Sequence, residues 1–301
     1  MNGIVVLKKE GGITSQGAVN RIKRLFGVKK AGHTGTLDPM ATGVLPILIG
    51  RAVKASEYML SSDKYYRATL RLGITTDTED TTGNILTECD SIPNEETVLS
   101  AISSFEGEIM QTPPMYSALK VGGKKLCDMA REGIEIEREA RPITVHSISA
   151  KRIDERNYSL DVHCSKGTYI RTLCADIGKA LGVGGAMAAL ERTKASVFTL
   201  DDAFTLGELE AMTEEERLAA VVPTERVFEK YRGMILPPFF ARLASSGCEI
   251  YLSKIGESAQ IGEKVRLSDE GGFFALGEVG IYEGGIAVKP VKQFRETDTI
   301  K

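Results

Sequence analysis

Hydrophobic and polar positions along the chain follow two different periods, which predicts strands mixed with helices. An apolar run over 3–7 indicates a strand. Over 65–72 every second residue is apolar, which predicts a strand with Tyr66 on its core side and Tyr65 on its opposite side. A similar alternation over 158–164 predicts another strand. No period of about 20–50 residues recurs, so a repeat architecture is not expected.

Two segments show the three- and four-residue spacing of amphipathic helices. In the segment 15–27, Ser15 is the expected N-cap and Gly27 the expected end. The second helix is expected over about 169–181, with Thr168 as its cap. Strands and helices therefore mix within one large unit, which is typical of the α+β class.

The composition changes near 231–238, where glycine and prolines follow an acidic helical stretch. Beyond it, short apolar runs separated by turn residues predict a small β-rich unit. A chain of 301 residues is long enough for two domains. We therefore place a large first domain at 1–231 and a small second domain at 232–301.

The composition is that of a folded globular protein, with 42% hydrophobic and 26% charged residues. No run approaches the roughly 18 apolar residues that a spanning helix needs, and the N-terminal residues lack the features of a signal peptide. We expect a cytoplasmic protein with no membrane partner. The five cysteines are scattered without a C-x-x-C pair, which argues against disulfides and a zinc cage. We expect no metal.

Charge is distributed unevenly along the chain. The net charge is only -3, but residues 1–64 have a balance of +6, whereas residues 77–108 hold nine acids and no base. One cationic surface on an acidic protein would attract an anionic polymer. Ordinary solvated faces remain the alternative explanation for the charges alone.

The most informative segment is 32–46, GHTGTLDPMATGVLP, whose three glycines and two prolines predict a loop of fixed shape. Pro39 disfavours helical geometry at Asp38, so the carboxylate is presented on a rigid turn. From these residues alone, a local Asx turn or a helix cap is the favoured explanation of Asp38. A phosphate-binding loop is disfavoured, because the segment lacks the G-K-[S/T] ending and the G-x-G-x-x-G spacing.

Four long motifs occur in a fixed order: GHTGTLDPMATGVLP at 32–46, DKYYR at 63–67, PMYSALK at 114–120 with GKKL at 123–126, and CSKGTYIRT at 164–172. Together they closely resemble the TruB family of tRNA pseudouridine synthases, and the resemblance runs from about residue 3 to 200. It implies the pseudouridine-synthase fold, a mixed, mostly antiparallel sheet with flanking helices, as a catalytic domain. It also implies a small PUA-like RNA-binding domain at the C-terminus.

The resemblance implies an isomerase that converts the T-loop uridine of tRNA, conventionally numbered fifty-five, to pseudouridine. That reaction breaks the bond from N1 to C1′, turns the base and rejoins it through C5. No group or electron enters from outside, so no cofactor is expected. The expected partner is the T arm of tRNA, from which the uridine must be flipped out. An additional role in tRNA folding is compatible with this activity, and we expect a monomer.

Three catalytic residues are implied by the family pattern. Asp38 would be the nucleophile, and Arg171 would supply the cation that keeps a carboxylate ionised beside a nucleobase. Tyr66 would pack on the base and accept the C5 proton. From the residues alone, a core tyrosine is the favoured interpretation of Tyr66. Whether the first step involves C1′, C6 or C2′ stays open.

Further residues would contact RNA. By resemblance, His33 would hold the flipped conformation, Tyr169 would line the pocket beside the arginine, and Leu190 would lie near the site with Arg192. Phosphates would be bound by lysines and arginines. The expected donors are Lys9, Arg21, Lys29, Lys30, Lys64, Lys120, Lys124, Lys125 and Lys166.

The sequence departs from the family pattern at one place, and two other classes of function remain as alternatives. The family's Lys-Pro-x-Gly run is replaced by one in which Glu10 stands in place of proline. A carboxylate-based glycosidase would need a second carboxylate about 5–9 Å from Asp38, and none is evident in the motif. A non-catalytic RNA-binding protein would use the basic face and the second domain, with Asp38 only structural.

Overall fold

The computed structural model describes residues 1–295, so the last part of the expected second domain, 296–301, lies outside the described residues. The strands are β1 Gly3–Lys9, β2 Ala31–His33, β3 Thr42–Ile49, β4 Lys64–Leu72, β5 Ile74–Thr76, β6 Ile85–Glu88, β7 Gly107–Gln111, β8 Lys120–Val121, β9 Lys124–Lys125, β10 Arg141–Arg152, β11 Asn157–Cys164, β12 Gly185–Ala195, β13 Phe198–Thr199, β14 Arg232–Ile235, β15 Ile250–Tyr251, β16 Lys264–Asp269, β17 Gly272–Tyr282 and β18 Gly285–Gln293. The α-helices are α1 Ser15–Leu25, α2 Ser56–Leu60, α3 Glu95–Ser103, α4 Leu126–Arg131, α5 Ile170–Ala180, α6 Leu206–Ala211, α7 Glu214–Ala219, α8 Pro238–Ser245 and α9 Leu252–Ile255.

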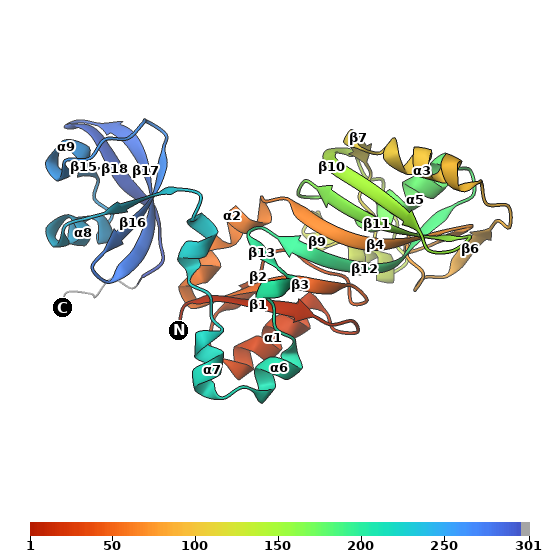
Figure 1. Cartoon of the computed structure of the whole chain (residues 1–301), viewed down its shortest axis with the longest axis horizontal. Coiled ribbons are helices and arrows are strands. Elements are labelled where there is room, and N and C mark those ends of the chain that lie inside the picture. Colours follow the sequence, from red (N-terminus) through yellow and green to blue (C-terminus); the bar gives the residue numbers. More distant parts are fainter. Residues whose placement is uncertain (296–301) are drawn as a thin grey trace.

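The large sheet occupies the centre and right of Figure 1. Within residues 1–295 it has nine strands, in the order β1-β3-β12-β4-β11-β10-β7, with β2 on β3 and β13 on β12. Its pairs are antiparallel except β3 with β12. The expected mixed, mostly antiparallel sheet with flanking helices is therefore confirmed.

The alternation that predicted β4 decides which face of the sheet is covered. Ala68, Leu70 and Leu72 are buried, whereas Arg67 and Arg71 are exposed. Helix α5 packs against β4 and β12, and α1 packs against β2 and β3. The core therefore lies on one face of the sheet, and the neighbouring strands β11 and β12 hold β4 at its centre.

The N-cap position of each helix lies one residue away from the expected one. Helix α1 is capped by Thr14, whose hydroxyl accepts from Gly17 N at 3.0 Å, so Ser15 is its first helical residue. At α5 the cap position is Tyr169, because Thr168 donates its hydroxyl to the Ser165 carbonyl instead. The expectations for Ser15 and Thr168 were wrong, since each hydroxyl has another hydrogen-bond partner.

The smaller sheet, at the left of Figure 1, has the order β14-β16-β17-β18-β15 within the described residues, and α8 and α9 pack against it. This confirms the β-rich character expected of the C-terminal part. The two sheets share a hydrophobic cluster centred on Phe228, which is fully buried. Its ring contacts Tyr58 from the first part and Phe273 and Phe294 from the second.

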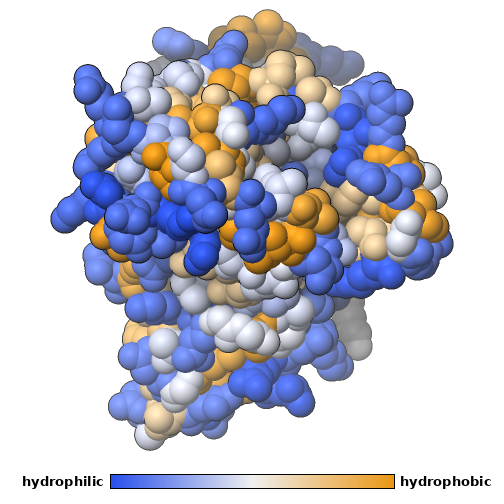
Figure 2. Space-filling model, turned by 90° about the vertical axis from the view of Figure 1, so that its right-hand side faces the viewer, coloured by the Kyte–Doolittle hydropathy of each residue, from blue (hydrophilic) through white to orange (hydrophobic). Residues whose placement is uncertain are grey.

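The surface carries scattered apolar residues among polar ones. On the face seen in Figure 2, hydrophobic residues form small groups separated by hydrophilic ones. Single exposed apolar residues of this kind are usual in globular proteins. Among residues 1–295, no helix combines the length and the apolar character needed to span a bilayer.

Candidate active site

The loop that carries Asp38 is tied to the start of the chain by hydrogen bonds to its main chain. Ser15 Oγ accepts from Leu37 N at 2.8 Å and donates to Leu37 O at 2.9 Å. On the other side of Asp38, the Pro39 carbonyl accepts from Gly12 N at 2.8 Å. The residues before and after the carboxylate are therefore fixed to α1 and to the turn preceding it.

Lys9 reinforces the same loop and is only 1% exposed. Its Nζ donates to the carbonyls of Glu10, Pro39 and Ala41 at 3.0, 3.1 and 2.6 Å. The expectation that Lys9 binds phosphate is therefore corrected, because three carbonyls use its three N–H donors. The Glu10 side chain is exposed, and its carbonyl is the group that contacts Lys9.

Arg192 joins the loop to the centre of the sheet and is 1% exposed. Its guanidinium donates to Val44 O at 2.8 Å and to Gly35 O at 3.1 Å. Gly43 permits this junction, because its φ of 99° is left-handed and a Cβ would lie 2.3 Å from the Arg192 carbonyl oxygen. The loop is therefore anchored at both ends.

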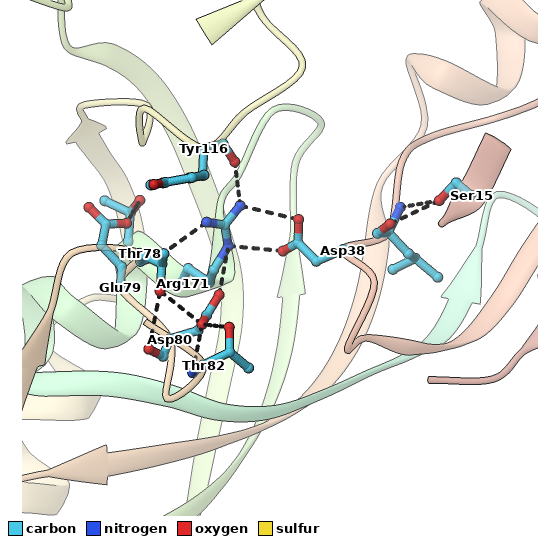
Figure 3. A network of polar contacts seen from close by, with 10 residues as sticks. Ser15, Asp38, Thr78, Glu79, Asp80, Thr82, Tyr116 and Arg171 are labelled. Atoms are coloured by element: carbon cyan, nitrogen blue, oxygen red, sulfur yellow. Dashed lines mark hydrogen bonds and ion pairs between the residues drawn. The ribbon is translucent and has the colours of Figure 1, made fainter. Parts of the chain in front are cut away.

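Asp38 meets Arg171, although 133 residues separate them in sequence. Arg171 Nε donates to Asp38 Oδ2 at 2.9 Å and Nη2 donates to Oδ1 at 3.2 Å, a bidentate pair (Figure 3). The guanidinium also donates to Thr78 O at 3.1 Å and to Tyr116 O at 2.6 Å. The Arg171 side chain is 6% exposed and that of Asp38 is 31% exposed, so the carboxylate is the reachable partner.

A second carboxylate lies behind the arginine. Asp80 Oδ2 is 3.9 Å from Arg171 Nε, and Figure 3 shows the guanidinium between Asp38 and Asp80. Asp80 is 8% exposed, and its Oδ1 accepts hydrogen bonds from Thr78 and Thr82. Asp80 lies outside the motif at 32–46, in which no second carboxylate was evident. Its contact with Arg171 and its hydrogen bonds from Thr78 and Thr82 indicate that it helps to fix the arginine.

Three groups around Arg171 were missed by the sequence reasoning. Thr78 and Asp80 belong to the acidic segment 77–108, which was interpreted only as a region whose negative charge contrasts with the positive segment 1–64. Tyr116 lies in a quoted motif but contributes its main-chain carbonyl, which residue type cannot reveal. The one signal in the sequence was that the acidic segment 77–108 contains no lysine or arginine. Because a buried acid needs a cation, the cation for this segment has to come from another part of the chain.

Glu79, next to these residues, helps to fix the first turn of α5. Its Oε2 accepts from Thr172 Oγ1 at 2.6 Å, and burial raises its pKa. Its φ of 63° is unusual for a residue other than glycine. The turn that holds Asp80 is therefore attached directly to the helix that carries Arg171.

Tyr66 lies on β4 between Val162 of β11 and Arg192 of β12. It is half-buried and packs against the main hydrophobic core, as its place in the alternation predicts. Burial raises the pKa of Tyr66, and the charge and hydrogen bond of Arg192 partly oppose this. Its hydroxyl therefore stays protonated at neutral pH.

Tyr169 is positioned by the side chain of Gln111. Gln111 Oε1 accepts from Tyr169 N at 2.8 Å, and Nε2 donates to Tyr169 O at 3.1 Å. Burial raises the pKa of Tyr169, which is half-buried at the start of α5, two residues before Arg171. Leu190 is 9% exposed and belongs to the main core.

His33 lies on β2 at the start of the loop, where it is half-buried. Burial, followed by the charge of Arg192, lowers its pKa, so the imidazole is neutral at physiological pH. Its Nδ1 is buried and has no hydrogen-bond partner among residues 1–295. The ring is therefore poised for an additional polar contact.

Lys64 is buried at the start of β4, which corrects its expected role at phosphate. Its Nζ donates to the Leu60 carbonyl at 2.9 Å and also to the Ser62 carbonyl. Burial lowers the pKa of Lys64 to about 8. The other expected phosphate donors are exposed: Arg21, Lys29, Lys30, Lys120, Lys124, Lys125 and Lys166.

The fold is that of the pseudouridine synthases. The chain superposes on a chain of a crystal structure of a Cbf5-Nop10-Gar1 complex with a TM-score of 0.73 and 28% identity, covering 97% of this chain and 85% of the other. It matches a structure of an H/ACA RNP bound to a substrate RNA containing 2'-deoxyuridine with a TM-score of 0.72 and 25% identity, covering 98% and 86%.

Two family models cover most of the chain. Residues 23–170 match the N-terminal domain of TruB family pseudouridylate synthases, and residues 171–237 match a tRNA pseudouridylate synthase B C-terminal domain. A tRNA pseudouridine synthase B of Clostridium tetani (strain Massachusetts / E88) is 42% identical over 92% of this chain and 96% of its own length. One of Alkaliphilus oremlandii (strain OhILAs) is 43% identical over 93% of each. The chain belongs to the TruB family of pseudouridylate synthases.

Proposed function

We propose that the protein converts the T-loop uridine of tRNA to pseudouridine, with Asp38 as nucleophile and without a cofactor. The observation that carries this proposal is the bidentate pair of Asp38 and Arg171, in which the carboxylate is partly exposed and the cation is buried. A loop fixed at both ends holds the two carboxylate oxygens of Asp38 on a side chain that is 31% exposed, where a nucleotide can reach them. The relatives' names, which specify tRNA, support the choice of substrate.

The substrate uridine must leave the base stack before its sugar can reach Asp38. Unstacking costs a few kcal/mol, so the protein must stabilise the flipped nucleotide. We assign this role to His33 and Tyr169. His33 offers an unpartnered ring nitrogen at one end of the loop, and Tyr169 offers a half-buried ring beside Arg171.

Each catalytic side chain then has a distinct task. Asp38 attacks the nucleotide, and Arg171 balances its charge through two hydrogen bonds. Tyr66 packs against the turned base and, once its own hydroxyl proton has passed to solvent, accepts the C5 proton as a phenolate, which the Arg192 guanidinium stabilises. Leu190 forms part of the apolar floor on β12.

We propose that exposed lysines and the C-terminal part of the chain, from residue 232, bind the rest of the tRNA. Lys120, Lys124 and Lys125 lie on the β8–β9 hairpin, and Lys166 lies just before α5. We propose a catalytic domain at 1–231 and a PUA-like RNA-binding domain at 232–301, in a monomer located in the cytoplasm. A further role in tRNA folding would use the same contacts.

The test is to incubate the full chain with an unmodified T-arm stem-loop and to map modified uridine by carbodiimide labelling. We expect one labelled uridine for the wild type and none for Asp38→Asn, with tRNA affinity changed by less than about tenfold. Asp161→Asn is the matched control, because Asp161 is an exposed carboxylate paired with Arg67. It should be fully active.

Three results would contradict the proposal. Retained activity in Asp38→Asn would remove the nucleophile assignment. Release of free uracil would favour hydrolysis by two carboxylates over isomerisation. RNA binding with no change in any uridine would favour a non-catalytic RNA-binding protein.

A further inference from the structure

A cluster of two histidines and one aspartate lies away from the catalytic loop. Asp63, His146 and His163 place their ligand atoms within 4.8 Å of one another. The chain has only three histidines, so two of them converge on one carboxylate. The cluster lies on the side of the large sheet that Tyr65 faces, opposite the side of Tyr66, and none of its members takes part in the proposed reaction.

Three neighbouring strands bring the cluster together. Asp63 immediately precedes β4, His163 lies on β11 opposite Tyr65, and His146 lies on β10. The register shifts between Val145 and Ser147, so the chain carries one additional residue, His146, at this point of the ladder. Such a bulge re-aims a side chain, and bulges are enriched next to functional sites.

The distances fit metal coordination better than hydrogen bonding. Asp63 Oδ2 is 3.3 Å from His146 Nε2 and 3.5 Å from His163 Nε2. Hydrogen bonds from N–H to O centre on about 2.9–3.0 Å, which is shorter than both. Bonds of about 2.0–2.1 Å in a tetrahedral zinc site place neighbouring ligand atoms about 3.3 Å apart. The two distances from the carboxylate to the imidazoles already have about this spacing, and all three ligand atoms lie within 4.8 Å of one another.

The ring of His163 is held in place by its neighbours. Tyr65 stacks on it with ring centroids 4.0 Å apart and planes inclined by 7°, and the His146 ring lies 4.5 Å away. A ring fixed in this way loses little freedom when it binds an ion. The side chains of Asp63 and His146 are 47% and 36% exposed, so a cation can reach them from solvent.

We propose that Asp63, His146 and His163 bind one divalent transition-metal ion, with Zn²⁺ as the best match. Two imidazoles and a carboxylate suit Zn²⁺, whereas Ca²⁺ and Mg²⁺ prefer oxygen ligands alone. Asp63 and His163 also line a cavity of about 450 Å³, which leaves room for a water or an anion as fourth ligand. The ion would join β4, β11 and β10 at one end of the sheet.

The proposed site departs from the expectation that the protein binds no metal. That expectation rested on cysteine spacing, and a site assembled from three strands leaves no spacing signal in the sequence. The site is separate from the catalytic residues. Its test is therefore independent of whether uridine is modified.

The experiment is a calorimetric titration of the full chain, freed of metal by EDTA, with Zn²⁺. We expect one ion bound per chain and a higher Tm in its presence. His163→Gln and Asp63→Asn should each weaken binding by at least about tenfold, since even outer-shell changes commonly cost that much. His33→Gln and Asp161→Asn, which remove an imidazole and a carboxylate elsewhere, should bind Zn²⁺ like the wild type.

Co²⁺ provides a second measurement, because tetrahedral Co²⁺ absorbs strongly in the visible range. The wild type should show these bands, and His146→Gln should lose or shift them. The proposal is overturned if the wild type shows no saturable binding of Zn²⁺. It is equally overturned if the three cluster variants bind the ion as tightly as the two control variants.

Discussion

At the scale of single residues, Arg171 is the group on which the candidate site depends. It is buried, and it contacts Asp38, Asp80 and two main-chain carbonyls. The sequence pointed to it through the family motif. In the structure it lies in the first turn of α5, where a cation is unfavourable. The carboxylates of Asp38 and Asp80 explain why a cation is stable there, because their attraction for the guanidinium exceeds its repulsion by the positive end of the helix dipole.

Replacing Arg171 should destabilise the protein as well as inactivate it. We expect Arg171→Ala to lower the free energy of unfolding by about 3–5 kcal/mol, because a buried charge loses its partner. The exposed pair of Arg67 and Asp161 provides the control, and Arg67→Ala should change the free energy of unfolding by less than about 1 kcal/mol. Urea unfolding measures both. Equal losses in the free energy of unfolding would show that the buried contacts of Arg171 stabilise the protein no more than the exposed pair of Arg67 and Asp161.

Lys64 should give the unfolding free energy a pH dependence. Burial lowers its pKa to about 8 in the folded protein, whereas the unfolded chain keeps the ordinary lysine value of 10.5. Between pH 8 and pH 10.5 Lys64 binds a proton in the unfolded chain but not in the folded protein. The free energy of unfolding therefore rises with pH over this range, and the contribution of Lys64 to it is lowest below pH 8. Unfolding of wild type and Lys64→Met, compared at the two ends of the range, should show the larger rise for the wild type. Parallel curves would contradict the lowered pKa.

At the scale of elements, the alternation along β4 separates two adjacent tyrosines. Tyr66 packs against the core side beside Arg192, whereas Tyr65 stacks on His163 on the other side. Secondary-structure period alone predicted this division. The end points of helices were less predictable, since Ser15 and Thr168 both use their hydroxyls for contacts other than capping.

The two tyrosines should therefore differ in their effect on catalysis. Tyr66→Phe should slow single-turnover conversion of a T-arm stem-loop by about 100-fold or more, because it removes the proton acceptor. Tyr65→Phe keeps the ring and its stacking and should stay close to the wild-type rate. Similar losses in both variants would contradict the division of faces.

At the scale of the whole molecule, the chain has a net negative charge, but its lysines and arginines are distributed unevenly along the sequence. The exposed lysines of the β8–β9 hairpin and Lys166 are separated in sequence from the acidic segment 77–108. Two of the cations we expected at phosphate, Lys9 and Lys64, are buried in carbonyl cages instead. Residue type could not distinguish these two uses of a lysine.

Binding of tRNA should weaken steeply as salt rises, because each phosphate contact releases counterions. Lys125→Gln should reduce the slope of log affinity against log salt by about 1, if this exposed lysine contacts one phosphate. Filter binding over a series of salt concentrations measures the slope. A flat response in the wild type would remove the electrostatic argument.

The sequence by itself determined the α+β class, the strands β1, β4 and β11, the family and the candidates Asp38, Tyr66 and Arg171. These follow from local periodicity and from motifs that are continuous in the chain. The family resemblance already implied that Arg171 would stand beside Asp38, but tertiary structure alone decided their bidentate geometry, the place of Asp80 next to the arginine and the convergence of two histidines on Asp63. The physical reason is that such contacts join strands and loops far apart in sequence, where no local pattern records which side chains will face each other.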